Sequence, residues 1–236
     1  MNYLFIFAGI QNLAQNTVPL NDKGSEATEI SLNFIDLAFK GGWIMIPILA
    51  LSAIAMYIFF ERYYAIRKAA KKDSNFMNRI RDYIHDGKID SAVALCESND
   101  TPVSRMISKG IKRIGRPLND VNAAIENIGN LEVSKLEKNL PTLATVAGAA
   151  PMIGFLGTVM GMIQAFYDMS NAGNNIDISL LSNGIYTAMV TTVAGLIVGI
   201  IAYFAYNILV AKVEKVVFNM EATTTEFMDL LNEPIK

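Results

Sequence analysis

The chain has 236 residues, of which 52% are hydrophobic and only 18% charged, and its formal net charge is -2. Soluble domains carry about a quarter charged residues, so the composition argues against an ordinary soluble enzyme, and the near-neutral charge argues against a nucleic-acid-binding protein. A single cysteine and a single histidine speak against a zinc site or Ser/His/Asp catalysis, and we expect no metal and no cofactor.

Residues 1–40 are predicted to precede the first membrane span. The first ten residues are apolar but lack the basic start of a secretory signal, and residues 21–33 are polar, which is typical of a linker. Two alternatives remain open for residues 1–14. They form either a signal cleaved near Ala14 or a retained amphipathic segment on the outer membrane face.

Three uncharged runs follow, at residues 41–60, 139–167 and 178–211, with 20, 29 and 34 residues. A membrane-spanning helix needs about 20 mostly apolar residues, so each run is long enough to cross a bilayer. Strands of a transmembrane barrel would alternate polar and apolar residues instead. The sequence therefore predicts an all-α integral membrane protein with three transmembrane helices. Pro47 lies inside the first run, where we expect neighbouring groups to satisfy the carbonyl that it frees.

Charge between the runs predicts the orientation. Residues 61–138 hold 15 Lys/Arg and 11 Asp/Glu, whereas residues 168–177 hold two aspartates and no cation. Cations concentrate in cytoplasmic loops close to the spans. We therefore expect residues 1–40 and 168–177 outside the cell membrane, and residues 61–138 and 212–236 in the cytoplasm. The cations nearest the first span, interpreted as topology anchors or alternatively as a docking site for a partner, are Arg62, Arg67 and Lys68.

The soluble parts carry helical periodicity, which predicts a helical cytoplasmic domain between the first and second spans. Residues 212–236 have an apolar stripe and no early helix breaker. The third span is therefore expected to continue into the cytoplasm as one helix from Ser179 to Asn232, about 80 Å long. The predicted helices of the cytoplasmic domain cover residues 74–85, the region of Ala92 to Cys96, residues from Pro102 to Gly115, and a segment that starts at Asp120, is capped by Asn119 and runs toward Pro141.

The second and third spans are rich in small residues, whereas the first is bulky and suits a helix that faces lipid. Small residues spaced four apart let two helix backbones approach closely. Both spans contain more of them than a single helix pair would use. The pattern therefore favours a homo-oligomeric ring with these spans inside, and close packing within one subunit is the alternative. The candidate helix-packing residues are Gly154, Gly157, Gly161, Gly195 and Gly199.

Threonines in the same two spans are candidates for a polar path. Hydroxyls on a face of small residues can line such a path, although membrane threonines more often bond to the carbonyl four residues earlier. The spans contain no Asp, Glu, Lys, Arg or His, whereas proton paths through membranes normally include an ionisable group. The spans therefore form either a passive scaffold or one half of a two-component device whose acid lies on another chain. The candidate pore-lining residues are Thr158, Thr187, Thr191 and Thr192.

Two stretches resemble the signature of the MotA/TolQ/ExbB proton-channel family. They are residues 149–163, AAPMIGFLGTVMGMI, and residues 184–196, GIYTAMVTTVAGL. The Phe60-Glu61-Arg62 exit from the first span, the turn at residues 87–92 and the predicted topology also match. The resemblance covers roughly residues 35–232 and is closest to ExbB and TolQ, because a flagellar MotA-type subunit would have four spans.

The resemblance implies a pentamer of this subunit around the transmembrane helices of a dimeric ExbD-like partner, which carries a membrane aspartate. Protons, or alternatively sodium ions, would cross between that aspartate and the inner wall, where the family's pore threonines fall on Thr158 and Thr192. Ion flow would then energise a TonB-like protein that acts on outer-membrane importers. The resemblance thus implies a protein of the bacterial inner membrane, with residues 1–40 and 168–177 in the periplasm. A TolQ-like or gliding-type envelope role, or a non-conducting scaffold, is the alternative. Many ExbB and TolQ proteins have a glutamate where this chain has Thr187.

Overall fold

A computed structural model describes residues 41–71, 73, 75–171 and 178–232. The chain divides into two units, residues 1–34 and residues 35–236, and every described residue belongs to the second. Predictions about residues 1–40 and about most of the loop at 168–177 lie outside the described part. Within that part there is no strand, which confirms the all-α class. Its helices are α3 (Met45–Ala69), α4 (Phe76–His85), α5 (Ile89–Ser98), α6 (Pro102–Ile111), α7 (Leu118–Glu137), α8 (Leu140–Asn171) and α9 (Ile178–Asn232).

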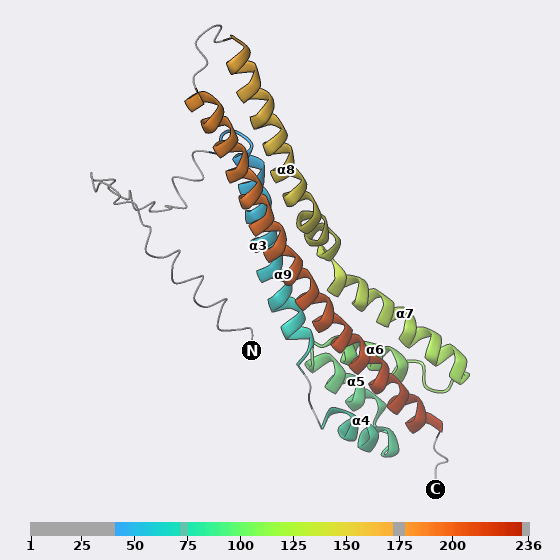
Figure 1. The fold of residues 1–236 in the computed structure, drawn as a ribbon. Helices are drawn as coiled ribbons and strands as arrows, with labels where there is room; N and C mark the ends of the chain where they lie inside the picture. The colour runs from blue at the N-terminus through green and yellow to red at the C-terminus, as the bar shows by residue number, and fades with distance from the viewer. Residues whose placement is uncertain (1–40, 72, 74, 172–177, 233–236) are drawn as a thin grey trace, which may run out of the picture. The chain divides into compact units, whose positions relative to one another are not determined.

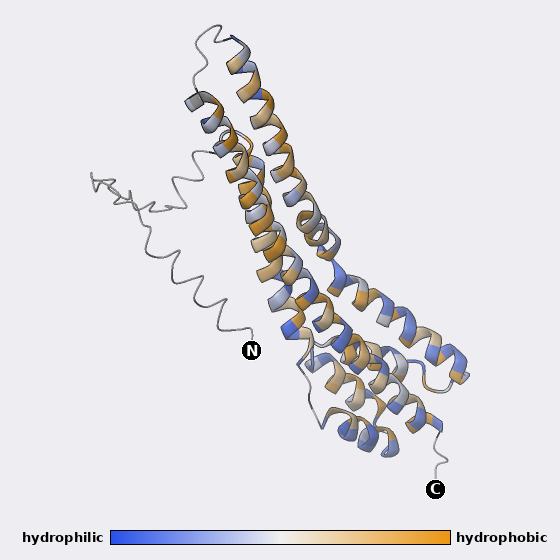
Figure 2. Ribbon diagram, viewed as in Figure 1, coloured by the Kyte–Doolittle hydropathy of each residue, from blue (hydrophilic) through white to orange (hydrophobic). Residues whose placement is uncertain are grey.

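Three long helices, α3, α8 and α9, form the uncharged part of this unit. The helical segments that contain them are long and apolar enough to cross a membrane, in agreement with the three predicted spans. Helix α8 packs along α9, and α3 packs against both (Figure 1). Hydrophobic residues cover these helices over the length of the uncharged runs, and hydrophilic residues take over where α4 to α7 begin (Figure 2).

Helix α9 is one continuous rod of 55 residues, as the lack of breakers predicted. At about 1.5 Å per residue it is roughly 83 Å long, which is far more than a bilayer requires. Its second half is stable because it is packed. Leu209, Val213, Val216 and Phe227 are buried in a core shared with the shorter helices, and α4, α6 and α7 all contact α9.

Pro47 in α3 and Pro151 in α8 have different consequences for their helices. Pro47 lies in the first turn of α3, where backbone N–H groups have no partner within the helix anyway. It therefore frees no carbonyl, and the expectation that neighbours must satisfy one was wrong. Pro151 lies in the middle of α8 and removes the bond to the Ala147 carbonyl. Gly199 of α9 packs directly against the Pro151 ring and this carbonyl.

Two predicted boundaries of the short helices coincide with the structure, because α4 ends at His85 and α6 begins at Pro102. Thr101 caps α6 in a capping box with Ser104, and Pro102 occupies the first turn. Helix α6 ends at Ile111 rather than at Gly115. The predicted cap at Asn119 was wrong, because α7 begins at Leu118, directly after Pro117, and Asn119 lies inside its first turn.

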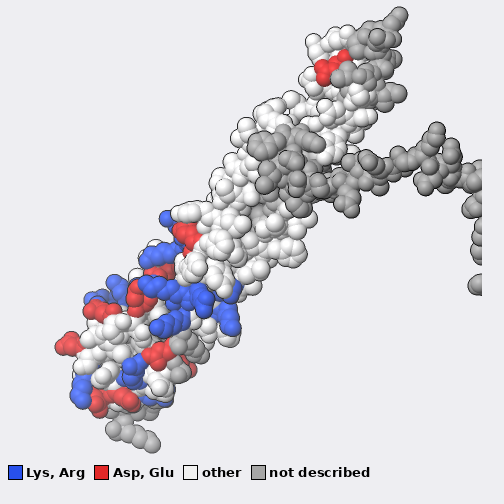
Figure 3. Space-filling view, turned by 90° about the vertical axis from the view of Figure 1, so that its left-hand side faces the viewer, with Lys and Arg blue, Asp and Glu red and all other residues white. Residues whose placement is uncertain are grey.

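Charged side chains gather at one end of the unit. Figure 3 shows Lys and Arg concentrated where the uncharged part meets the short helices, with Asp and Glu interspersed beyond. Helix α3 crosses this boundary without a break, since it continues past residue 60 to Ala69. The boundary therefore divides the unit into an apolar part and a polar part that share two helices, α3 and α9.

Candidate functional site

The contact between α8 and α9 is built on glycine. A Cβ atom added to Gly195 would lie 2.5 Å from the Ala150 carbonyl oxygen and 2.9 Å from the Gly154 Cα, and one added to Gly154 would lie 2.9 Å from the Thr191 carbonyl oxygen. These neighbours are backbone atoms, so no rotamer change could make room. The two backbones touch only because neither helix carries a side chain here.

The other predicted packing glycines lie along the same contact. A Cβ at Gly161 would meet the Ala188 Cβ at 2.7 Å, and Gly157 faces the Thr191 side chain. Gly199 closes the row against Pro151. The five glycines are thus occupied within one chain. They give no support for a ring, and the alternative of close packing inside one subunit accounts for them.

The structure separates the two adjacent threonines of α9. Thr191 is 1% exposed, and its hydroxyl donates to the Ala188 carbonyl oxygen at 2.7 Å. It fills the space left by Gly157, close to Ile44 at the start of α3. Because its hydroxyl reaches no surface of the chain, this packing gives no support to the prediction that Thr191 lines a pore.

Thr158 of α8 and Thr192 of α9 lie face to face. Their Oγ1 atoms are 2.9 Å apart, and both residues are half-buried. The Thr158 hydroxyl is also 2.7 Å from the Phe155 carbonyl oxygen, and the Thr192 hydroxyl is 2.9 Å from the Gly154 carbonyl oxygen. The close approach at Gly154 is what brings the two helices within reach of this cross-helix contact.

Proton counting shows what this pair can do. Each hydroxyl has one proton to donate, so two protons serve three short oxygen–oxygen contacts. If both hydroxyls donate to carbonyls, their lone pairs face each other and can accept a bond from water, from hydronium or from a protonated acid. If one hydroxyl turns toward the other, a carbonyl is released. The pair can therefore accept and pass on a hydrogen bond, although it holds no titratable group.

Thr187 is not part of this pair. It lies five residues before Thr192, which places it about 140° around α9. It is half-buried and lies nearer in angle to Thr191, on the side that packs inward. The structure thus brings together two of the four predicted pore residues, Thr158 and Thr192, and leaves Thr187 and Thr191 apart from them.

An open apolar groove on α8 begins at Thr158. Its other lining residues include Val159, Ile163 and Phe166, which are 41%, 61% and 52% exposed. The groove follows the helix toward its far end, where Gln164 donates to Asp168 at 2.8 Å. An apolar surface that starts at a hydroxyl pair is suited to packing against another transmembrane helix.

A second polar cluster, at the joint between α7 and α8, was missed in the sequence. Arg62 is 8% exposed, and its Nη1 donates to the Lys135 carbonyl oxygen at 3.0 Å. Arg62 also pairs with Glu61, whose other oxygen accepts a bond from the Asn139 amide at 3.3 Å. Asn139 has φ 65, a left-handed conformation that asparagine tolerates better than most residues.

Arg62 therefore acts as a helix cap for α7. A cation that bonds one of the last carbonyls of a helix satisfies an orphan acceptor and complements the helix dipole. Because α7 ends at Glu137 and α8 begins at Leu140, the Glu61–Arg62 pair fixes the angle at which α8 starts. In the sequence, Glu61 and Arg62 directly follow an uncharged run. A buried charged pair needs hydrogen-bond partners elsewhere in the chain, so this position was the signal that could have indicated the cluster.

A third cluster joins the short helices below the boundary. Glu132 of α7 is 4% exposed and pairs with Arg105 of α6 at 2.6 Å and with Lys135 at 2.7 Å. The Glu132 hydrogen bond raises the pKa of Arg105 above its ordinary value. Lys68, at the end of α3, bonds Asp100 at 3.0 Å. Lys68 is thus a surface ion-pair partner that ties α3 to the turn before α6.

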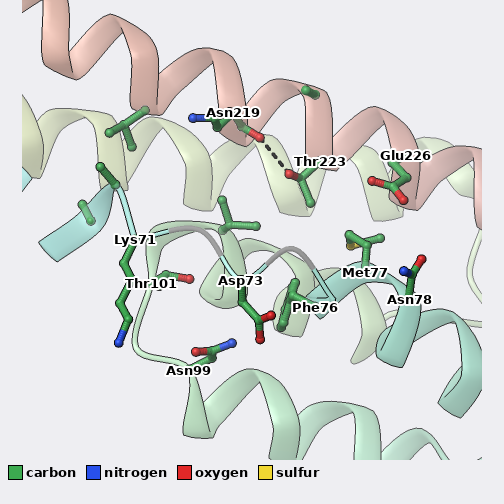
Figure 4. A pocket seen from close by; sticks show the side chains of 15 residues that line it. Lys71, Asp73, Phe76, Met77, Asn78, Asn99, Thr101, Asn219, Thr223 and Glu226 are labelled. Carbon is green, nitrogen blue, oxygen red and sulfur yellow. Dashed lines mark hydrogen bonds between the residues drawn. The ribbon is translucent and has the colours of Figure 1, made fainter. Parts of the chain in front are cut away.

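The polar hollow shown in Figure 4 has no converging set of ligand groups. It has a volume of about 260 Å³ and lies between α4, the turn before α6 and the tail of α9. Thr223 donates to the Asn219 carbonyl oxygen at 2.8 Å, Thr101 caps α6, and Asp73 pairs with Arg79. Ligand sites generally hold about 300–1,000 Å³, and the polar groups here are engaged locally, so we assign it no ligand.

Comparison with known proteins agrees with this geometry. A biopolymer transport protein ExbB homolog of Methanothermobacter thermautotrophicus is 28% identical over 187 residues, or 78% of this chain and 65% of that protein. The Tol-Pal system protein TolQ of Pseudomonas aeruginosa is 27% identical over 81% of this chain and 87% of its own length. The biopolymer transport protein ExbB of Aquifex aeolicus is 39% identical over 37% of this chain and 59% of its own length.

The match to the archaeal protein thus spans slightly less than two thirds of that relative. Relatives with long matches carry both ExbB and TolQ names. The sequence profile of the MotA/TolQ/ExbB proton channel family matches residues 98–222, which is 125 of the 236 residues and includes both Thr158 and Thr192. More than half of the chain therefore carries the family pattern, and the chain belongs to the MotA/TolQ/ExbB proton channel family.

Proposed function

We propose that this chain is an ExbB-like subunit of an inner-membrane motor driven by an ion gradient. In this proposal, copies of the chain form a ring, expected to be a pentamer, around the transmembrane helices of an ExbD-like partner. Thr158 and Thr192 provide the hydroxyls of the ring's inner wall. The expected product of ion flow is movement of the partner helices, which energises a TonB-like protein.

The observation that supports this proposal best is the hydroxyl pair at the α8–α9 contact. Two half-buried hydroxyls that have fewer protons than contacts lie beside an open apolar groove. Both belong to the runs at residues 139–167 and 178–211, which contain no charged side chain. Such a wall can hold a wet path, but it cannot bind or release a proton near neutral pH. The acid that titrates must then come from a helix in the groove, as the membrane aspartate of an ExbD-like partner would.

Thr187 is consistent with a subunit that supplies no titratable group of its own. At this position a family glutamate would add a second titratable group, and this chain offers only a hydroxyl. The subunit would then act as a passive wall, and the partner's aspartate would do all the proton exchange. Each elementary charge that crosses 100 mV releases about 2.3 kcal/mol, so a few ions can drive a substantial movement.

A TolQ-like role is the second candidate, since the match to TolQ of Haemophilus influenzae covers 85% of this chain and 94% of that protein. Both roles share the ring and the ion path and differ in the partner that receives the work. Deleting the gene and measuring ligand import through outer-membrane transporters, beside the integrity of the envelope, separates them. Loss of import alone favours the ExbB-like role.

The ion path is tested by flux. The chain is co-purified with the one-span, aspartate-bearing protein of its source, weighed to obtain the subunit ratio, and reconstituted into liposomes with an internal pH dye. We expect Thr158→Val and Thr192→Val each to reduce proton influx at least tenfold, and Thr158→Ser to retain it. The matched control is Thr145→Val, because the Thr145 hydroxyl on the same helix bonds only the Pro141 carbonyl, at 2.9 Å.

Two results would count against the proposal. Full flux in both valine variants would remove the hydroxyl pair from the path. A purified complex that moves no ions under a gradient would favour the scaffold alternative. Replacing the proton gradient with a sodium gradient in the same liposomes determines which ion is carried.

A further inference from the structure

A second surface feature, independent of the proposed ion path, lies between α3 and α9. A groove of about 340 Å³ separates the two helices within the uncharged part. Met56 and Phe59 line it from α3, and Ile201, Phe204 and Ile208 line it from α9. Met56, Ile201 and Phe204 are each more than half exposed, so the groove opens outward from the helices.

The dimensions of the groove match one leaflet of a bilayer. Its lining on α9 extends from Val198 to Ile208, and the ten helical steps between these residues span about 15 Å along the helix axis. The hydrocarbon core of a bilayer is about 30 Å thick, so half of it is also about 15 Å. The volume falls within the range of about 300–1,000 Å³ that is usual for ligand sites. A single extended hydrocarbon chain therefore suits this space.

One end of the groove leads to an unpaired cation. One helical turn beyond Phe59 and Ile208 lie Tyr63 and Lys212, and the Lys212 Nζ is 5.1 Å from the centroid of the Tyr63 ring. Lys212 forms no ion pair with any residue in the described part of the chain. It lies next to the last uncharged residue of the third run, at the boundary where Figure 3 shows cations gathering. This is the depth at which lipid phosphates lie.

We propose that this groove binds an anionic phospholipid, with one acyl chain between α3 and α9 and its phosphate against the Lys212 ammonium. Charge decides between a lipid and a second copy of the chain. The spans contain no acidic residue, and Glu61 already pairs with Arg62, so the spans of a neighbouring copy would leave Lys212 without an anion. A phosphate supplies that anion, and basic sites between membrane helices commonly recruit it.

The test is a lipid titration followed by native mass spectrometry on the purified full chain in detergent. The probes are palmitoyl-oleoyl phosphatidylglycerol and palmitoyl-oleoyl phosphatidylcholine. We expect one phosphatidylglycerol per chain, bound more tightly than phosphatidylcholine. Lys212→Gln should weaken phosphatidylglycerol binding about fivefold, since one surface cation contributes about 1 kcal/mol, and Lys212→Arg should restore it. Lys215→Gln, which removes a cation three residues further along α9, is the matched control and should change nothing.

A second variant fills the groove and tests acyl-chain binding without changing the charge of Lys212. Ala205→Phe, at a half-buried lining position, should remove tight binding of both lipids while the thermal unfolding of the chain stays unchanged. Equal binding of the two lipids, or equal effects of Lys212→Gln and Lys215→Gln, would overturn the phosphate contact. Efficient disulfide cross-linking between copies through Met56→Cys, in a Cys96→Ala background, would overturn it in favour of a second copy.

Discussion

Gly195→Ala is the change that tests the packing of α8 on α9 most directly. The added Cβ would lie 2.5 Å from the Ala150 carbonyl oxygen, whereas ordinary contact begins at 3.4 Å. The helices would therefore have to separate by about 0.9 Å at this level, because backbone atoms on both sides leave no rotamer to adjust. Forcing extra volume into a close-packed contact typically costs about 1–3 kcal/mol.

The matched control is Gly148→Ala on α8, where an added Cβ meets nothing within 4 Å. That variant should gain up to about 1 kcal/mol from helix propensity. Both variants are unfolded thermally in the same detergent. The two variants then differ by about 1–4 kcal/mol, and with about 2–4 °C per kcal/mol for a chain of this size, Gly195→Ala should melt about 2–16 °C below Gly148→Ala. Equal melting temperatures would refute the glycine contact and the helix register on which the Thr158–Thr192 pair depends.

Three further predictions concern single side chains. Arg62→Met should lower the free energy of unfolding by about 1.5–3 kcal/mol, because it removes a charged hydrogen bond to the Lys135 carbonyl. Arg67→Met, at an exposed position of the same helix, is the control and should change the free energy of unfolding by no more than about 0.5 kcal/mol. Thermal melts measure both. Burial raises the pKa of the Cys96 thiol to about 12, so on the order of one thiol in 10,000 is ionised at pH 8. Iodoacetamide should therefore label Cys96 only after denaturation. Rapid labelling of the native chain would contradict this burial. Thr187→Val should reduce proton flux less than Thr158→Val, and equal losses would place Thr187 in the path.

The fold could be predicted from the sequence largely because charge and breakers mark its boundaries. Uncharged runs identify the spans, and the absence of a breaker after Gly199 predicts the long α9. The joint between α7 and α8 was predicted only in outline, as a segment that runs toward Pro141, whereas α7 ends at Glu137 and α8 begins at Leu140. The bonds that Glu61 and Arg62 make at this joint could not be predicted in the same way, because these two residues lie more than 70 residues earlier in the chain.

The candidate site was only half predictable for a geometric reason. Thr191 and Thr192 are neighbours in sequence and differ by about 100° around α9. Which of them meets Thr158 depends on the angle at which α8 crosses α9, and that angle is set by the backbone contact at Gly154 and Gly195. The resemblance to a known family singled out the threonines. The packing of α8 on α9 decides that Thr192 contacts Thr158 and that Thr191 is buried.

The glycine contact also limits how copies of the chain can assemble. Because the five packing glycines of α8 and α9 are occupied within one chain, we expect a ring of copies to be held mainly by the larger side chains that remain exposed. Outside the uncharged part, Phe218 of α9 is 70% exposed and Leu131 of α7 is 58% exposed. Such residues would be buried between neighbours in the proposed ring. The polar path would then lie on the wall that each subunit builds alone, while assembly depends on the bulky faces around it.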